Sequence, residues 1–455
     1  MPWRRDPINL QSRMQAVPTA VCADLLDFTA DPGLTDRASP AVRWRPAHWL
    51  LINDAGRIAA VQPEAPGDDW CKLDRRGQLL LPGFIDSHVH SPQIDVIASW
   101  GSELLDWLNT YTFPAEARHA DPVFAQAGAA LFLDALLAHG STAAVVFPTV
   151  HSASTEALFA AAQQRGMRLI TGKVLMDRHA PDNLRDSADP AVVRAECTAL
   201  IERWHGQGRL AYAVTPRFAA TSTPAQLAMA GQLLADHAGL YLQTHVAENR
   251  AEVAWIAELY PEARSYLDVY ARHGLLTERA VLAHGIWLDD ADRALLHDSG
   301  AQIAFCPSSN LFLGSGLFGW RQAAEAGVNV SLASDVGGGT SLSMQRTMAD
   351  GYKVQALAGQ RVTAWALLHA ATRGAAVGLQ LGAEIGCFEP GAMADLCLWD
   401  WAVGPLAQHR DGLARELHER VFAWLTLGDE RNLVEAWVGG VQRHARAAQE
   451  PHAAT

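Results

Sequence analysis

Eight apolar, strand-like runs alternate with Ala- and Leu-rich segments through the middle of the chain, and this alternation constrains the fold more than any other feature. The runs are Leu79–Asp86, Thr142–Phe147, Leu169–Met176, Leu210–Phe218, Leu240–Val246, Val281–Ile286, Gln302–Cys306 and Val328–Asp335. Strands that are apolar along their whole length are typical of parallel sheets covered on both faces. Eight such units in about 250 residues predict an α/β fold built on a (β/α)8 barrel.

An open, doubly wound sheet is the alternative for the same alternation. Such a sheet usually carries a glycine-rich phosphate-binding turn after its first strand. Here the first predicted strand runs into Pro82–His90 (PGFIDSHVH), which is not a turn of that kind. The sequence therefore favours the barrel, with helices predicted at Phe124–Ala138, Thr155–Gln164, Pro190–Trp204, Ala225–Ala235 and Ala291–Leu296.

The two ends of the chain lack the alternation of strand-like and helical segments that marks the middle. Near the N-terminus, His48–Ile52 and Arg57–Gln62 flank a turn and predict a β-hairpin. Near the C-terminus, Ala394–Trp399 and Val434–Val438 are short strand candidates. We expect the two ends to meet in one small β-sandwich module. The predicted limits are 1–78 and 386–455 for its two parts, and 79–385 for the barrel.

Composition excludes several classes of protein. Of the 455 residues, 49% are hydrophobic and 19% are charged, which excludes a disordered chain. The 36 Lys and Arg against 49 Asp and Glu give a net charge of −13, so we expect no nucleic-acid partner. The six cysteines include no Cys-x-x-Cys pair and are too sparse for a disulfide framework, which indicates a cytoplasmic protein. We also expect no signal peptide, transmembrane helix or membrane partner.

Histidine and aspartate side chains stand at the ends of several predicted strands. His88 and His90 flank one residue at the end of the first strand, so both point to the same side. The fifth, sixth and eighth strands end in His245, His284 and Asp335. Active sites of these barrels lie at the C-terminal edge of the strands, where the five side chains should converge. Imidazole and carboxylate are ligands that zinc favours, so the pattern predicts a metal site.

Longer motifs around these positions carry a family resemblance. Pro82–His90, His245, His284 and Ser334–Asp335 resemble the amidohydrolase superfamily. Within that superfamily the chain resembles the guanine deaminases, through Pro92–Gln93, Leu105–Asn109, Tyr111–Glu116, Thr215–Phe218, His245–Asn249 and Cys306–Asn310. The resemblance extends from Leu80 to Gly440.

The resemblance implies hydrolysis of guanine to xanthine and ammonia by a metal-activated water. It implies a set of four metal ligands: His88, His90, His245 and Asp335. Asp335 would also accept the proton of the activated water, and His284 would hydrogen-bond that water rather than hold the metal. Glu248, three residues beyond His245, would protonate a ring nitrogen and relay a proton to the leaving amine.

The metal count and the purine pocket follow from the same resemblance. Relatives with two metals use a bridging lysine at the end of the fourth strand, and Val214–Phe218 contains none. We therefore expect one Zn²⁺ per chain, with iron as the alternative. Gln93 and Arg217 would pair with the oxo edge of the purine and Phe218 would stack on its face. A helix-capping amide, a surface ion pair and a core ring are the alternative interpretations of these three.

The family also implies a homodimer, and two other functions stay open. A related aminopurine or triazine deaminase, or a chlorohydrolase, would share the metal ligands and differ at Gln93, Arg217 and Phe218. A non-enzymatic metal-binding barrel would lack a ligand or Glu248, all of which are present.

Overall fold

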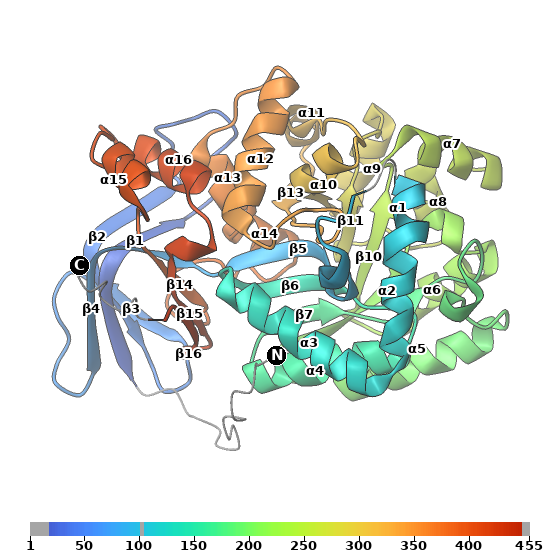
Figure 1. Cartoon of the computed structure of the whole chain (residues 1–455), viewed down its shortest axis with the longest axis horizontal. Helices are drawn as coiled ribbons and strands as arrows, with labels where there is room; N and C mark the ends of the chain where they lie inside the picture. Colours follow the sequence, from blue (N-terminus) through green and yellow to red (C-terminus); the bar gives the residue numbers. More distant parts are fainter. Residues whose placement is uncertain (1–17, 101–103, 448–455) are drawn as a thin grey trace, which may run out of the picture.

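A computed structural model describes residues 18–100 and 104–447. The expectation about a signal peptide, and the outermost residues of the predicted segments 1–78 and 386–455, lie outside the described residues. Figure 1 shows two parts within the described chain: a barrel surrounded by helices, and a separate sheet to its left.

The middle of the chain forms a parallel barrel. Its strands run in the hydrogen-bonding order β13-β12-β11-β10-β9-β7-β6-β5, with β8 beside β9. Their bounds are β5 (Phe84–His90), β6 (Ser141–Phe147), β7 (Arg168–Thr171), β8 (Val174–Leu175), β9 (Leu210–Pro216), β10 (Tyr241–Val246), β11 (Ala280–His284), β12 (Gln302–Phe305) and β13 (Asn329–Leu332). The predicted barrel is confirmed.

Main-chain hydrogen bonds connect the first barrel strand to the segment that follows the last one. The N–H of Asp335 donates to the carbonyl of His88, and the N–H of His90 donates to the carbonyl of Val336, both at 2.9 Å. Predicted metal ligands therefore lie directly at the seam of the barrel.

Helices cover the outside of the barrel (Figure 1). The larger helices of the described residues are α3 (Pro122–Ala138), α4 (Ser152–Arg165), α5 (Pro190–Trp204), α6 (Pro224–Asp236), α7 (Arg250–Leu259), α8 (Tyr266–Arg272), α9 (Asp290–Ser299), α12 (Met344–Leu357), α13 (Ala364–Ala370), α15 (Pro405–Asp411) and α16 (Leu417–Leu427). Local sequence explains several starts: α3, α5 and α6 begin with proline after an Asp or Thr that caps the first turn. The five helices predicted from the sequence are all present, in α3 to α6 and α9.

Shorter helical segments lie mostly in loops at the barrel edge. They are α1 (Leu104–Trp107), α2 (Phe113–Ala117), α10 (Pro307–Phe312), α11 (Trp320–Glu325), α14 (Arg373–Gly378), η1 (Ser91–Val96), η2 (Leu108–Thr112), η3 (Arg118–Ala120), η4 (Asp182–Leu184), η5 (Ala219–Thr221) and η6 (Glu430–Asn432). Within the described residues, no single helix has the length and apolar composition to span a membrane. One pair, Leu108–Ala120 with Pro122–Ala138, meets those criteria only when joined across a bend of 116°.

Strands from both chain ends form the second sheet. Its order is β16-β15-β14-β4-β1-β2-β3, with bounds β1 (Thr19–Phe28), β2 (Val42–Ile52), β3 (Ile58–Gln62), β4 (Cys71–Pro82), β14 (Leu396–Trp399), β15 (Leu433–Val438) and β16 (Val441–Ala445). The predicted hairpin is β2 with β3, and the C-terminal strand candidates are β14 and β15. The two ends therefore meet in one module as expected, but its strands belong to a single hydrogen-bonded sheet and not to the two sheets of the predicted β-sandwich.

The first predicted strand, Leu79–Asp86, is divided between the two sheets. Its first half ends β4 and pairs with β14 in the module, whereas β5 of the barrel begins at Phe84. The change of direction falls at Gly83, where an added Cβ would lie 2.1 Å from the Thr142 hydroxyl. Pro82 and Gly83 mark a break at this point, but the apolar run resumes at Phe84, so the pattern does not show that the chain changes sheet.

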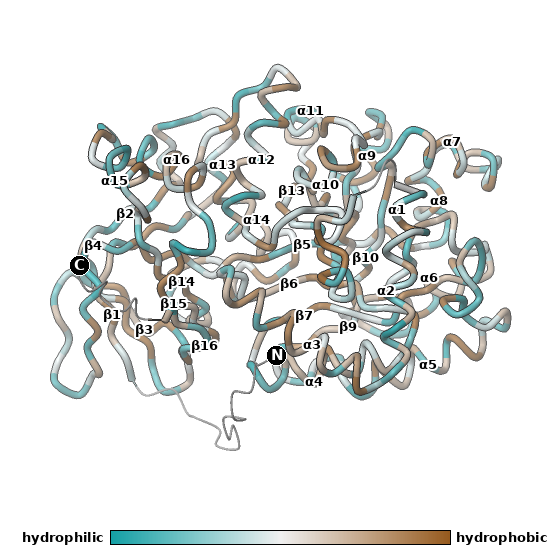
Figure 2. Tube along the Cα trace, viewed as in Figure 1, coloured by the Kyte–Doolittle hydropathy of each residue, from teal (hydrophilic) through white to brown (hydrophobic). Residues whose placement is uncertain are grey.

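Apolar side chains fill both faces of the barrel wall. Every residue of β6 is buried, and the trace of β6 and β7 is largely brown in Figure 2. The barrel interior is packed mainly by small or branched side chains, among them Ile85, Ala143, Val145, Ile170, Ala213 and Val281. The interior is thus a packed core, and the histidines and the aspartate of the predicted site lie at its C-terminal edge.

Candidate active site

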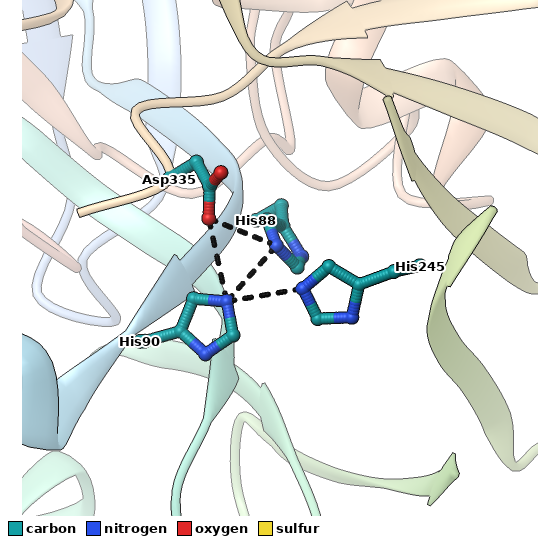
Figure 3. Close-up of side chains that lie close together, drawn as sticks. All are labelled: His88, His90, His245 and Asp335. Atoms are coloured by element: carbon teal, nitrogen blue, oxygen red, sulfur yellow. Dashed lines mark hydrogen bonds and ion pairs between the residues drawn. The ribbon is translucent and has the colours of Figure 1, made fainter. Parts of the chain in front are cut away.

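Four imidazole and carboxylate side chains meet at the C-terminal edge of the barrel (Figure 3). They are His88 and His90 of β5, His245 of β10 and Asp335 just beyond β13, and their ligand atoms lie within 4.8 Å of one another. The Nε2 atom of His90 is 3.2 Å from that of His88 and 3.3 Å from that of His245. Oδ1 of Asp335 lies 3.2 Å and 3.3 Å from the Nε2 atoms of His88 and His90. The structure thus brings these four residues together.

The donor atoms of this cluster fit a single metal ion. Ligand atoms around a tetrahedral zinc ion, with bonds of about 2.0–2.1 Å, lie about 3.3–3.4 Å apart. The N–H at Nδ1 of His245 donates to the carbonyl of Arg217 at 2.7 Å, which leaves the Nε2 lone pair facing the cluster. Facing lone pairs repel each other unless a cation lies between them.

Burial keeps the imidazoles of His90 and His245 neutral, as metal ligands must be. Burial lowers the pKa of His90 to about 3, although the hydrogen bond with Asp335 opposes this change. Burial, together with the neighbouring histidines, also lowers the pKa of His245 well below its usual value. Burial raises the pKa of Asp335, but the surrounding histidines outweigh burial and hold this pKa well below its usual range.

His284 ends β11 and lies beside the cluster. The N–H at its Nδ1 donates to Oδ1 of Asn310 at 3.0 Å. Its Nε2 lies 3.4 Å from Oε2 of Glu248 and 3.7 Å from Oδ2 of Asp335, and makes no hydrogen bond with the described residues. His284 and Asp335 have positive φ angles of 71° and 49°, a conformation that costs a side-chain-bearing residue about 1–3 kcal/mol. The backbone accepts this strain where both side chains enter the site.

Glu248 lies two residues beyond β10 and is 4% exposed. Burial, and the nearby carboxylate of Asp335, raise the pKa of Glu248 to about 8. The hydroxyl of Ser315 donates to its Oε1 at 2.9 Å. A carboxylic acid that keeps its proton near neutral pH can act as a proton donor.

A cavity opens beside these groups. Its walls include all three residues predicted to contact substrate, Gln93, Arg217 and Phe218. The other lining residues are His90, Trp107, Leu108, His245, Glu248, Glu252, His284, Leu313, Asp335 and Gly338. Every predicted site residue except His88 lines this one cavity.

Comparison with known proteins fits this arrangement. Residues 79–442 match the amidohydrolase family. A guanine deaminase from Escherichia coli (strain K12) is 44% identical over 367 residues, which cover 81% of this chain and 83% of that protein. The chain belongs to the guanine deaminase branch of the amidohydrolase family. The resemblance stated from the sequence motifs is confirmed.

Solved structures of guanine deaminases share the whole architecture. The E. coli guanine deaminase structure has a TM-score of 0.89 and 39% identity, and the match covers 94% of this chain and 99% of that one. A guanine deaminase structure from C. acetobutylicum with bound guanine in the active site has a TM-score of 0.84 and 25% identity, covering 93% of this chain and 99% of that one.

In this member of the guanine deaminase branch, Glu116 of α2 organises the polar wall of the cavity. Its carboxylate is fully buried and accepts hydrogen bonds from Nη1 of Arg217 at 2.9 and 2.7 Å, and from Nε2 of Gln93 at 3.0 Å. Oε1 of Gln93 accepts the N–H of Gly337 at 3.2 Å. Arg217 therefore forms a buried ion pair rather than a surface one. The available signal for Glu116 is its position at the end of the Tyr111–Glu116 motif.

Asp86 is a second functional candidate that the motif reasoning does not single out. It is fully buried in β5 and accepts the N–H of Ser334 at 3.0 Å and the Ser334 hydroxyl at 2.5 Å. Burial raises the pKa of Asp86 to about 6. Because Ser334 directly precedes Asp335, these bonds fix a predicted metal ligand across the barrel seam. The available signal is its position two residues before His88.

Proposed function

We propose that this chain hydrolyses guanine to xanthine and ammonia. The observation that carries the proposal is one cavity that combines a metal-type cluster, a buried carboxyl group with its pKa raised to about 8, and a polar wall of Gln93 and Arg217. Support also comes from the E. coli guanine deaminase, at 44% identity, and from the C. acetobutylicum enzyme that holds guanine.

A single metal ion, with Zn²⁺ preferred over iron, would be held by His88, His90, His245 and Asp335. Zinc bound there would lower the pKa of a coordinated water towards ~7. Relatives with two metal ions hold the second ion with a bridging lysine, so a second resident ion here would need a free lysine at the site. Lys173, which follows β7, is instead 2% exposed and paired with Asp186 and Glu196. This arrangement supports one metal per chain.

The proton-handling roles follow from the distances around the cavity. Oδ2 of Asp335 would accept the proton of the attacking water. His284, whose Nδ1 N–H donates to Asn310, would direct its Nε2 towards that water and towards the oxygen atom that the water adds to the substrate. Glu248 would give its proton to a purine ring nitrogen and then pass a proton to the leaving amine. The 3.4 Å between His284 Nε2 and Glu248 Oε2 brings both groups to one reacting carbon.

The polar wall would recognise the oxo edge of guanine. Glu116 fixes the guanidinium of Arg217 through Nη1, and we propose that the remaining N–H groups of Arg217 meet the purine oxygen. Gln93, held by Glu116 and Gly337, would pair with the adjacent ring edge. Phe218, only 8% exposed and 6.1 Å from the Trp255 ring centre, would cover one face of the purine.

Guanine turnover by the purified chain, with metal analysis of the same sample, tests this function. Ammonia release should be much faster with guanine than with adenine, cytosine, 8-oxoguanine or an aminotriazine. Preference for one of the others would indicate a related deaminase or chlorohydrolase. A metal-replete chain that turns over none of them would be a metal-binding barrel without this activity.

We further propose a cytoplasmic homodimer that acts in purine catabolism. All six cysteines are free in the structure, as suits a reducing compartment. The homodimer is taken from the family resemblance, and sedimentation or light scattering of the purified chain would test it.

A further inference from the structure

A second group of potential metal ligands adjoins the first. It consists of His284, Cys306 and Asp335, whose ligand atoms also lie within 4.8 Å of one another. Cys306 directly follows β12, and its fully buried thiol donates to the carbonyl of Ala304 at 3.3 Å. No role proposed above uses this thiol.

Asp335 belongs to both groups through different oxygens. Its Oδ1 faces His88 and His90, whereas its Oδ2 lies 3.7 Å from Nε2 of His284. A carboxylate placed in this way can bridge two ions, which in two-metal sites lie about 3.5–4 Å apart. The second group can therefore bind an ion without releasing the first.

His284 supplies the independent sign of a ligand. The side chain is 1% exposed, and its Nε2 makes no hydrogen bond with the described residues. Since Nδ1 donates to Asn310, the Nε2 lone pair faces the second group. Oε2 of Glu248, 3.4 Å from the same nitrogen, offers a further oxygen ligand.

We propose that His284, Cys306 and Asp335 form a second, weaker site for a soft divalent cation such as Cd²⁺ or excess Zn²⁺, and that filling it inhibits the enzyme. An ion there takes the His284 lone pair and Oδ2 of Asp335, which handle protons in the reaction. The inhibition rests on the proposed function, whereas the binding does not.

The chemistry of the ligands selects the ion. The Cys306 thiol loses its proton to solvent when the sulfur–metal bond forms, and Glu248 loses its own where it also binds the ion, so one or two protons are released for each ion bound. Thiolate favours soft cations, while Mg²⁺ prefers oxygen ligands. His284, Glu248 and Asp335 all line the cavity, which gives an ion a path to the buried sulfur.

The experiment titrates Cd²⁺ into the one-metal holoenzyme while ultraviolet thiolate-to-cadmium absorption, bound cadmium and guanine turnover are followed. All proteins carry C71S, because Cys71 is the exposed cysteine. The parent should take up one further equivalent, develop the thiolate band and lose turnover; Mg²⁺ should do none of these. C306A should lack the band and raise the half-inhibiting concentration at least about tenfold, since even changes outside the ligand shell cost 10–100-fold.

C397A is the matched control. Cys397 is also fully buried and donates to a carbonyl, that of Gly140 at 3.2 Å, but it lies in the module. This variant should behave as the parent does. If C306A does not fold, C306S serves in its place, because serine also removes the thiolate band.

Four results overturn separate parts of the reasoning. A parent that develops no thiolate band, or a band that persists in C306A, refutes the site. A band in the parent with unchanged guanine turnover refutes the inhibition. No guanine turnover in the one-metal form refutes the proposed function, while the cadmium band still decides whether the site exists.

Discussion

Replacing Glu116 with glutamine tests how the polar wall is held. The carboxylate accepts three hydrogen bonds, two from Arg217 and one from Gln93. Glutamine removes the negative charge and keeps only one acceptor oxygen, so an N–H of its amide group must face other N–H donors. Arg217, 3% exposed, is then left as a buried cation without a counter-charge.

The magnitude follows from the burial of the pair. Removing one partner of a buried ion pair costs about 3–5 kcal/mol, because the other charge stays desolvated. We expect Glu116→Gln to lower the free energy of unfolding by about that amount. We also expect kcat/KM for guanine to fall by at least about 100-fold, since 1.4 kcal/mol corresponds to tenfold and Arg217 and Gln93 both lose their anchor.

The assay compares denaturant unfolding and guanine kinetics with those of a control variant. Glu416→Gln makes the same change in the pair with Arg37, whose side chains are 54% and 60% exposed. Exposed pairs contribute about 0–1 kcal/mol, so the control should unfold and react much as the parent does. If Glu116→Gln also matched the parent in both measurements, Glu116 would not anchor the wall.

Four further predictions concern the acid, the metal, the specificity and the pH dependence. Glu248→Gln should retain the metal by elemental analysis but lose about 10²–10⁴-fold in kcat; parental turnover would rule out the proton shuttle. A chelator should abolish guanine turnover, and about one equivalent of Zn²⁺ per chain should restore it; a requirement for two would contradict the mononuclear site. The parent should prefer guanine to adenine by about 10⁴–10⁵ in kcat/KM, and Arg217→Ala should reduce the guanine value far more than the adenine value; equal losses would refute the oxo-edge role. Burial, and the neighbouring Glu248 carboxylate, raise the pKa of Glu252 to about 7 from 4.5, so ionising it opposes folding, and Glu252 should account for about 3 kcal/mol of the stability lost as pH rises through this interval. Glu252→Gln should lack that part of the decrease in denaturant unfolding measured at both ends of the interval and keep the part that comes from Glu248, and an unchanged pH slope would refute the assignment.

The barrel strands were predictable because buried parallel strands are apolar throughout, and little else in a soluble chain has that pattern. The positions where a predicted strand is interrupted were not predictable. The run Leu169–Met176 is divided into β7 and β8 around Gly172, where a Cβ would lie 1.9 Å from the carbonyl oxygen of Ala213. Such a break depends on how closely a neighbouring strand approaches, and that distance is absent from the local pattern.

The candidate site also contains some residues that could be predicted from the sequence and one that could not. His88, His245, His284 and Asp335 could be predicted because each lies where a strand meets the barrel mouth. Glu116 comes from a helix after the first strand, and its distance from Arg217, 101 positions away, is set by packing alone. A carboxylate in such a segment gives no sequence sign of which cation it will meet.

The burial of the cavity-lining groups has one effect on Arg217 and another on Glu248. A buried cation must have a counter-charge, and the ion pair of Arg217 with Glu116 meets that requirement. Glu248 is equally buried but has the carboxylates of Asp335 and Glu252 nearby and no arginine or lysine partner among the described residues. It therefore keeps its proton up to a pKa of about 8. Giving Glu248 a cation, as Glu116 has, would lower its pKa and disfavour the protonated form that the proposed reaction needs.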